Sequence, residues 1–179
     1  MVYVFLAEGF EEIEALATVD ILRRCEISVE TVSITEDLMV KGTHGICVKA
    51  DITFDAIRED EISALVLPGG LPGADNLGDF KKLTDLLCEK AKEGKILAAI
   101  CAAPKVFGLL GLLSGKKATC YPGFEAKLVG AICKRKDVVV DKNIITAKGA
   151  GVTHAFAEAI ADALGKGATC RRVLKAMFY

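Results

Sequence analysis

The sequence predicts an α/β fold in which a mostly parallel sheet is covered on both faces by helices. Short apolar runs without polar alternation occur at 2–7, 64–70 and 96–101, as expected of strands buried on both faces. Segments with helical spacing of apolar residues, at 11–25 and 80–93, separate them. Because strands and helices alternate along the chain, parallel strands joined by crossover helices are the expected architecture.

In the first third of the chain, the strand at 2–7 leads into a helix at 11–25. This helix has acidic residues in its first turn and arginines in its last, as the helix dipole favours. Its apolar stripe is expected to consist of Ile13, Leu16, Ala17 and Ile21. The segment 28–34 alternates as a strand does, and 42–51 is a candidate for another strand.

The middle of the chain repeats the pattern of strand and helix. The strand within 64–70 runs into a glycine turn, and Gly94 closes the helix at 80–93. The strand at 96–101 is followed by a helix at 103–113 with a proline near its start. The remaining expected elements are a short strand at 118–121, a short helix at 123–132, a hairpin at 138–147 and helices at 153–164 and 168–177.

The composition narrows the class of protein. A length of 179 residues fits one domain spanning 1–179, without repeats or linkers. The net charge of −1 and short, separate basic runs argue against a nucleic-acid-binding surface. No apolar run approaches the roughly 18 residues of a membrane span. A strand-like segment begins at Val2, so no signal peptide is expected and the predicted location is the cytoplasm.

The cysteines predict free thiols in a reducing compartment. There are seven, an odd number, and no two form a CxxC pair. Neither zinc nor iron–sulfur spacing occurs, so we expect no metal site.

Three segments follow predicted strands: 7–14, 68–76 and 101–104. Ligands in open parallel sheets bind beyond the carboxyl ends of the strands. These three segments are therefore the candidates for a functional site.

Cys101 lies where a strand passes into a helix. Ala99 and Ala103 flank it, as the tight turn of a nucleophile elbow requires. The free amides at the helix start favour negative charge, so we expect a depressed thiol pKa and a reactive thiolate. The alternative is a buried, inert cysteine. We accept that alternative for the other six, Cys25, Cys47, Cys88, Cys120, Cys133 and Cys170.

Two further requirements of nucleophilic chemistry have candidates. The amides of Gly70 and Ala102 are the expected donors to an oxyanion, although the glycines are equally compatible with a plain turn. Glu14 shares a side of its helix with Thr18, Ile21 and Leu22, which would raise its pKa and let it carry a proton. The alternative is a peripheral glutamate. Glu11 and Glu12 are expected only to complement the helix dipole.

Four motifs taken together resemble the ThiJ/PfpI superfamily: AEGFEEIE, VLPGG, AAICAAP and AKGAGVTHAF. They are most similar to the branch of the Parkinson-linked glyoxalase/deglycase protein. The resemblance implies a flavodoxin-like three-layer α/β/α sandwich of the class I glutamine amidotransferase type, usually a homodimer without cofactor. It also implies that Cys101 is a reactive, oxidisable cysteine, that Glu14 hydrogen-bonds it, and that Gly70 and Ala102 form the oxyanion hole.

The activity that the resemblance implies is conversion of methylglyoxal or glyoxal to hydroxy acids, or repair of glycated side chains, in oxidative and carbonyl stress. One departure is Tyr121, where members of this branch often have histidine. Tyrosine, with a pKa near 10, is a poor base at neutral pH. Tyr121 and His44 are kept as accessory candidates; His154 is expected to have a capping or packing role.

Three alternatives to this enzyme stay open. One is a redox-sensing stress protein or chaperone that uses only an oxidisable thiol. Another is a cysteine peptidase, which Ala102 disfavours because the peptidase branch has histidine directly after the cysteine. The third is thiazole monophosphate biosynthesis, for which no phosphate-binding loop is present.

Overall fold

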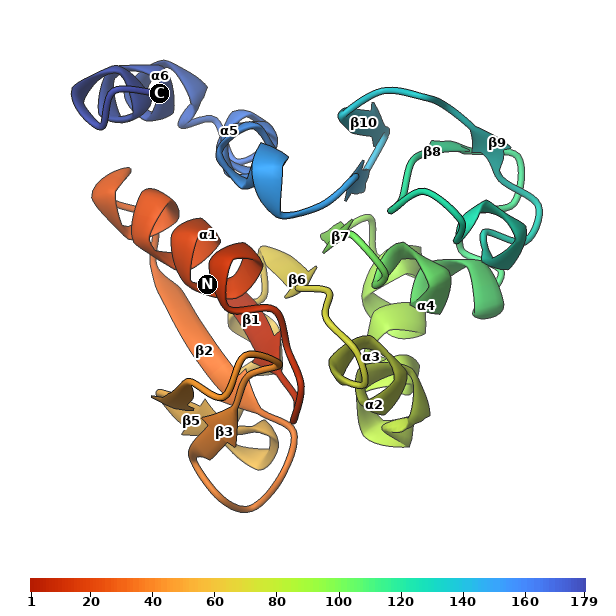
Figure 1. The fold of residues 1–179 in the computed structure, drawn as a ribbon, viewed down its shortest axis with the longest axis horizontal. Helices are drawn as coiled ribbons and strands as arrows, with labels where there is room; N and C mark the ends of the chain where they lie inside the picture. Colours follow the sequence, from red (N-terminus) through yellow and green to blue (C-terminus); the bar gives the residue numbers. More distant parts are fainter.

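A seven-stranded sheet forms the middle layer of the computed structural model, which describes residues 1–179 (Figure 1). All neighbouring strands pair in parallel except the last two along the chain, which form the predicted antiparallel hairpin. The predicted fold class is therefore confirmed. The strands, in their order across the sheet, are β10 (Val138–Asp141), β11 (Ile144–Ala147), β7 (Ile96–Ile100), β6 (Ala64–Leu67), β1 (Val2–Leu6), β2 (Val29–Ser33) and β5 (Ile52–Thr53).

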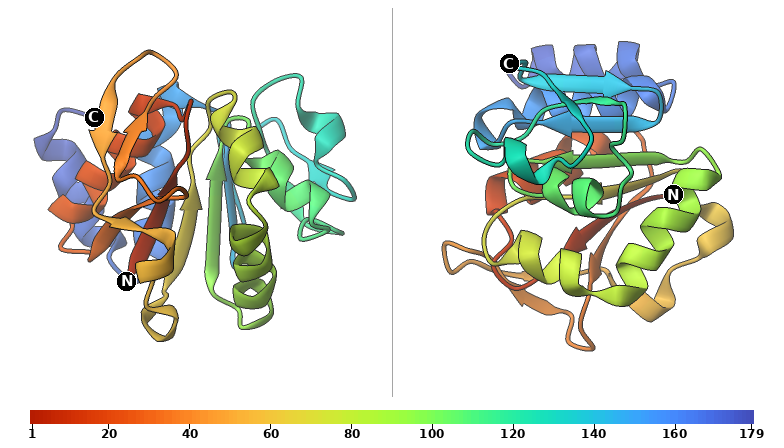
Figure 2. Two further views of the ribbon diagram at one scale, coloured as in Figure 1. Left: turned by 90° about the horizontal axis from the view of Figure 1, so that it is seen from below. Right: turned by 90° about the vertical axis from the view of Figure 1, so that its right-hand side faces the viewer.

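Helices cover both faces of the sheet, which gives three layers (Figure 2). One face carries α1 (Glu12–Arg24), α5 (Thr153–Ala163) and α6 (Gly167–Ala176), and the other carries α2 (Gly73–Asp79), α3 (Lys81–Lys92) and α4 (Pro104–Leu109). Successive side chains of a strand point to opposite faces. Val2 and Val4 of β1 accordingly join one core, while Tyr3 and Phe5 join the other. None of the helices combines the length and apolar character that crossing a bilayer requires.

Two small sheets and four 3₁₀ turns lie outside the seven-stranded sheet. A hairpin of β3 (Met39–Lys41) and β4 (Cys47–Lys49) lies beside α1 and supplies the strand expected within 42–51. Two short strands, β8 (Lys117–Ala118) and β9 (Ile132–Cys133), pair in parallel. Single 3₁₀ turns complete the fold: η1 (Phe54–Ala56), η2 (Glu59–Glu61), η3 (Glu125–Lys127) and η4 (Ala150–Val152).

The predicted apolar stripe of α1 is confirmed only at Ile21, which is fully buried, and is wrong at the other three positions. Ile13 is 57% exposed, and Leu16 and Ala17 are only half-buried. The buried face consists instead of Glu12, Glu14, Ala15, Thr18, Val19, Ile21 and Leu22. A different face of the helix is therefore buried than the one predicted. The prediction followed apolar residues only, whereas the buried face also contains polar residues near the carboxyl end of the sheet.

Other differences concern short elements. Helix α2 was not predicted, because GADNLGD is rich in glycine and aspartate, which are weak helix formers. The helix expected at 103–113 ends at Leu109, and Gly111 beyond it has a left-handed φ of 71°. The helix expected at 123–132 is reduced to η3, and the strand expected at 118–121 ends at Ala118. Pro122 and Gly123 interrupt regular structure there.

Candidate active site

The three segments that follow strands β1, β6 and β7 meet at one edge of the sheet, as expected. The amide of Glu11 donates to the carbonyl of Gly69 at 2.9 Å, and that of Gly73 to the carbonyl of Gly9 at 3.2 Å. These bonds join the loop after β1 to the loop after β6. Cys101 follows β7 directly, between these loops and β11.

Cys101 occupies a tight turn between β7 and α4. Its φ of 64° is in the left-handed region, which is unusual for a residue with a side chain. Its amide donates to the carbonyl of Ala147, and its carbonyl accepts from the amide of Tyr121, at 2.9 and 2.8 Å. Ala99 and Ala103 are fully buried, which agrees with the steric demand predicted for an elbow. The thiol is half-buried.

Glu14 projects from α1 into the same region. Its side chain is almost completely buried, and its Oε2 accepts a 2.8 Å hydrogen bond from the amide of Gly69. Its Oε1 is buried without a hydrogen-bond partner. A Cβ atom placed on Gly149 would lie 3.9 Å from both this Oε1 and Cys101 Sγ. The free carboxyl oxygen and the sulfur therefore border the same small space.

Glycine at position 69 lets the carboxyl group and the cysteine approach each other. A Cβ atom there would lie 2.6 Å from Glu14 Oε2 and 2.7 Å from Cys101 Cβ. Real Cβ atoms do not come so close to other atoms. Sequence reasoning did not single out Gly69 or Gly149, although both belong to glycine-containing motifs, PGG and KGAG.

Burial controls the titration of both acids. It raises the pKa of Glu14 to about 7, although the Gly69 amide and the thiol oppose this. Burial and the charge of the neighbouring Glu14 carboxylate raise the pKa of Cys101 to about 12, against the lowering effect of the Ala102 and Gly70 amides. The expected depression of the thiol pKa is wrong, because it considered the helix start without the desolvation and the neighbouring carboxylate.

The two titrations are linked, because the charge on ionised Glu14 raises the pKa of Cys101. The pair loses its first proton near pH 7 and its second near pH 12. Between these values it holds one proton and one negative charge. The amides of Gly70 and Ala102 favour the charge on sulfur, while the amide of Gly69 favours it on the carboxylate. An elbow thiol beside a carboxyl of near-neutral pKa is suited to nucleophilic attack with proton transfer.

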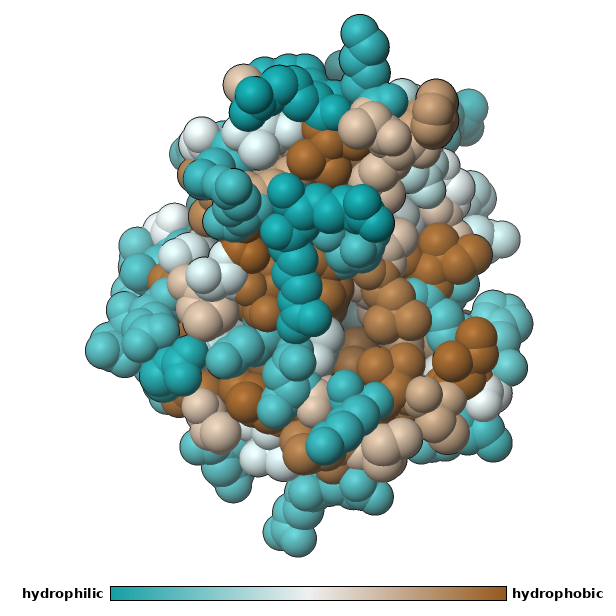
Figure 3. All heavy atoms as spheres, turned by 90° about the vertical axis from the view of Figure 1, so that its left-hand side faces the viewer, coloured by the Kyte–Doolittle hydropathy of each residue, from teal (hydrophilic) through white to brown (hydrophobic).

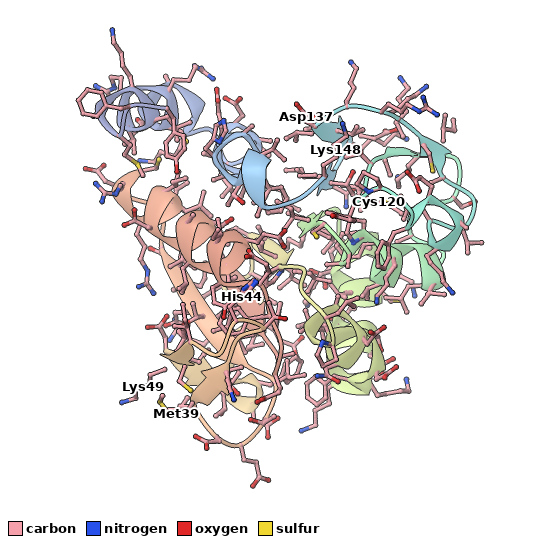
Figure 4. The ribbon with its side chains drawn as sticks, in the orientation of Figure 1. Met39, His44, Lys49, Cys120, Asp137 and Lys148 are labelled. Atoms are coloured by element: carbon pink, nitrogen blue, oxygen red, sulfur yellow. The ribbon has the colours of Figure 1, made fainter.

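The accessory candidates lie in different places. Tyr121 is 51% exposed, and its ring contacts that of Phe124 edge-on. The Tyr121 ring also lies beside the Cys101–Glu14 pair, because it is 3.4 Å from where a Cβ atom on Gly149 would be. His44 lies in the turn between β3 and β4, and its Nδ1 is 2.8 Å from Glu12 Oε2 (Figure 4). Neither histidine hydrogen-bonds Cys101.

Glu12 and His154 both have structural contacts. The carboxylate of Glu12 is buried and also accepts the amide of His44, so it fastens the β3–β4 hairpin to α1. The expectation that it only complements the dipole is wrong. His154 stacks on Tyr179 at 4.7 Å, in line with the expected packing role.

All seven cysteines are free thiols, as expected. Cys25, Cys120 and Cys170 are buried and Cys88 is half-buried. Cys47 and Cys133 are exposed, so the prediction that they are buried is wrong. Both belong to very short strands, which cover only part of a side chain.

One group of side chains has metal-ligand chemistry. Ligand atoms of Glu11, Glu12 and His44 lie within 4.8 Å of one another. Their atoms are already used internally, because Glu11 Oε2 caps α1 by accepting the amide of Glu14 and both oxygens of Glu12 accept from His44. We assign this group a structural role.

A cavity of about 360 Å³ opens next to the Cys101–Glu14 pair. It is lined by Tyr121, Pro122, Lys148, Gly149, Ala150, Gly151 and Val152. Gly149 borders both the sulfur and Glu14 Oε1, so this cavity adjoins the pair, although neither Cys101 nor Glu14 lines it.

Comparison with known proteins agrees with this fold. Residues 1–163 match the profile of the DJ-1/PfpI family. The chain is 38% identical to protein DJ-1 homolog B of Arabidopsis thaliana over 89% of its length, but spans only 37% of that relative. It is 34% identical to deglycase PfpI of Pyrococcus furiosus, covering 84% of this chain and 90% of the relative. The solved structure of oxidized Toxoplasma gondii DJ-1 superposes with a TM-score of 0.94 at 34% identity, covering 99% and 97% of the two chains.

Proposed function

Because the chain belongs to the DJ-1/PfpI family, we propose that it is a cofactor-independent enzyme that uses Cys101 to act on 2-oxoaldehydes. Its substrates are methylglyoxal, glyoxal or the side chains they have glycated, and it protects against carbonyl and oxidative stress. The main support is the elbow thiol beside Glu14, whose pKa is about 7. The deglycase name of the Pyrococcus relative agrees with it. Free thiols fit work in the reducing cytoplasm.

In the first step, ionised Glu14 takes the proton of Cys101 as the sulfur attacks the aldehyde carbon. The carbonyl oxygen becomes an alkoxide, which the amides of Gly70 and Ala102 stabilise as an oxyanion hole. Protonation of that alkoxide gives a hemithioacetal. Because the pKa of Glu14 is about 7, its carboxyl group can both accept the thiol proton and donate a proton to the alkoxide at neutral pH.

In the second step, Glu14 Oε1 removes the remaining hydrogen of the former aldehyde carbon as a proton. The resulting enediolate is reprotonated on the neighbouring carbon, so that the first carbon is oxidised to a thioester and the second is reduced to an alcohol. Water then hydrolyses the thioester, which releases the hydroxy acid and the thiol. The electrons stay within the substrate, and the reaction needs no external acceptor.

The test is lactate formation from methylglyoxal by the wild type, Cys101→Ser and Glu14→Gln. Glu8→Gln is a matched control, because Glu8 is an exposed residue of the same segment. We expect wild-type kcat/KM to rise with pH to a plateau above about pH 7, as Glu14 ionises. Both site variants should lose most activity and the control none. Equal rates in all four proteins would dispose of the proposal.

A redox function is the second candidate, and the half-buried sulfur facing two amides favours it. Those amides would stabilise an oxidised, anionic form of Cys101. Mild peroxide should then modify Cys101 before the other thiols, as resolved by mass spectrometry. Uniform modification of all accessible thiols would count against this function. A peptidase function is not proposed, because neither histidine hydrogen-bonds Cys101.

We also propose that the protein is a homodimer through the face formed by α1 and the β3–β4 hairpin. Ile13, Met39 and Ile46 are about half exposed there, at 57%, 50% and 54%. Apolar side chains gather on this side of the molecule among charged ones (Figure 3). Sedimentation should show a dimer in the wild type and a monomer after Ile46→Asp. A wild-type monomer would contradict the assignment.

A further inference from the structure

A second cavity, of about 520 Å³, lies next to the one beside the Cys101–Glu14 pair. Its lining residues are Thr119, Cys120, Pro122, Glu125, Cys133, Lys134, Arg135 and Lys148. It shares Pro122 and Lys148 with the cavity that borders Gly149. Lys148, Asp137 and Cys120 lie together on this side of the molecule (Figure 4). A ligand at the pair could therefore extend into the second cavity.

The second cavity has an excess of positive charge. Lys134, Arg135 and Lys148 line it, against the single carboxylate of Glu125. Lys148 pairs at 3.1 Å with Asp137, whose side chain is 67% exposed. The side chains of Lys134 and Arg135 make no ion pair or hydrogen bond, although Lys134 is half-buried. A partly desolvated cation without a partner attracts an anion from solution.

The backbone at Lys134 is anchored to the neighbouring strand. The amide of Lys134 donates to the carbonyl of Ala118 at 2.8 Å, which continues the pairing of β8 and β9. Glu125 is also held, since its Oε2 accepts the amide of Gly123 at 2.8 Å. The carboxylate is therefore held by the backbone, and it forms no ion pair with Lys134 or Arg135.

We propose that this cavity is a subsite for the phosphate group of a substrate whose carbonyl carbon reacts at Cys101. With Lys148 paired to Asp137, the two unpaired cations, Lys134 and Arg135, can together match the two charges of a phosphate dianion. The planar guanidinium of Arg135 can bind two phosphate oxygens at once. The substrate class is then carbonyl compounds that also bear a phosphate. The carbonyl part rests on the proposed function, whereas the anion subsite itself does not.

Alkylation of Cys133 tests the subsite without any reference to turnover. Cys133 is exposed and lines the cavity, while Cys47 is exposed on β4 of the separate β3–β4 hairpin, where the single cation of Lys41 is its cross-strand partner. For each cysteine, the rate of alkylation by anionic iodoacetate is divided by the rate with neutral iodoacetamide. Both reagents react with the thiolate, so the thiolate fraction cancels in this ratio. We expect this ratio to be about threefold higher at Cys133 than at Cys47, because the cations attract iodoacetate.

Inorganic phosphate should remove that difference, and acetate at equal ionic strength should not. The double variant Lys134→Ala/Arg135→Ala should also remove it, whereas Lys142→Ala, in the exposed turn between β10 and β11, should leave it intact. Equal ratios at the two thiols, or acetate as effective as phosphate, would overturn the phosphate subsite.

Enzyme kinetics with a phosphorylated and an unphosphorylated aldehyde provide a second test of the phosphate subsite. The double variant should raise KM for a phosphorylated 2-oxoaldehyde about fivefold, as expected for losing partly exposed ion pairs, and leave methylglyoxal turnover unchanged. Equal effects on both substrates would overturn the assignment. Phosphate protection of Cys133 in a protein inactive toward both aldehydes would retain the subsite and refute the proposed enzyme function instead.

Discussion

Replacing Glu14 with glutamine should make the protein more stable at neutral pH. The carboxyl is nearly fully buried, and its pKa rises from 4.5 to about 7 on folding. The folded state therefore binds the Glu14 proton more tightly than the unfolded state. As pH rises from 4.5 to 7, the wild type loses stability, and above about 7 the loss is complete.

Each unit of pKa difference corresponds to about 1.4 kcal/mol, so the full loss is about 3 kcal/mol. Glutamine has nearly the shape of the protonated acid, and its Oε1 can still accept the amide of Gly69. Since glutamine does not titrate, the variant escapes this loss. Cys101 does not contribute, because its ordinary pKa of 9.0 and its folded pKa of about 12 both lie above this range.

The assay is urea unfolding of the wild type and Glu14→Gln from about pH 4 to about pH 8. Other groups, including Glu12 with its lowered pKa, largely cancel in the difference between the two proteins. We expect the variant's advantage to grow by about 3 kcal/mol across this range and then level off. Parallel stability curves would refute the assignment of a raised pKa to Glu14.

Three further substitutions test the elbow and its surroundings. Urea unfolding should show that Cys101→Gly is more stable than Cys101→Ala by about 1 kcal/mol, because only glycine adopts the φ of 64° without strain. A more stable alanine variant would contradict the elbow geometry. Gly69→Ala should lower stability by about 2 kcal/mol by overpacking and reduce activity. Gly78→Ala, in α2, should lower neither, because a Cβ there meets only Val106 Cγ2 at an ordinary 3.4 Å. Tyr121→Phe should keep activity within about twofold, because the hydroxyl of a tyrosine is a poor base at neutral pH. A tenfold loss would show that the hydroxyl takes part.

The layers of the fold could be predicted from the sequence. So could the meeting of the three segments that follow strands β1, β6 and β7. Unbroken apolar runs identified the parallel strands, and small residues around Cys101 identified the elbow. The spacing of Glu14 with Thr18 and Leu22 placed all three on one buried side of α1. The motifs after β1, β6 and β7 then had to meet, because parallel strands end at the same edge.

What could not be predicted depends on packing between distant segments. The face of α1 that is buried was misjudged because Glu12 and Glu14 are polar, yet both find partners on other loops, His44 and Gly69. The pKa of Cys101 was misjudged for a related reason, since the burial and the charge of Glu14 come from elements far away in sequence. The cationic cavity is formed by residues from three short segments, 119–125, 133–135 and Lys148, and the short KRK run alone gave no sign of it.

The central claim is that Cys101 and Glu14 share one proton at neutral pH. The most direct measurement is the rate of Cys101 alkylation by iodoacetamide as a function of pH, resolved by mass spectrometry, in the wild type and Glu14→Gln. We expect a step near pH 7 in the wild type, where the pair loses its first proton, and no such step in the variant. A wild-type profile that is flat through pH 7, or the same step in both proteins, would contradict the shared proton.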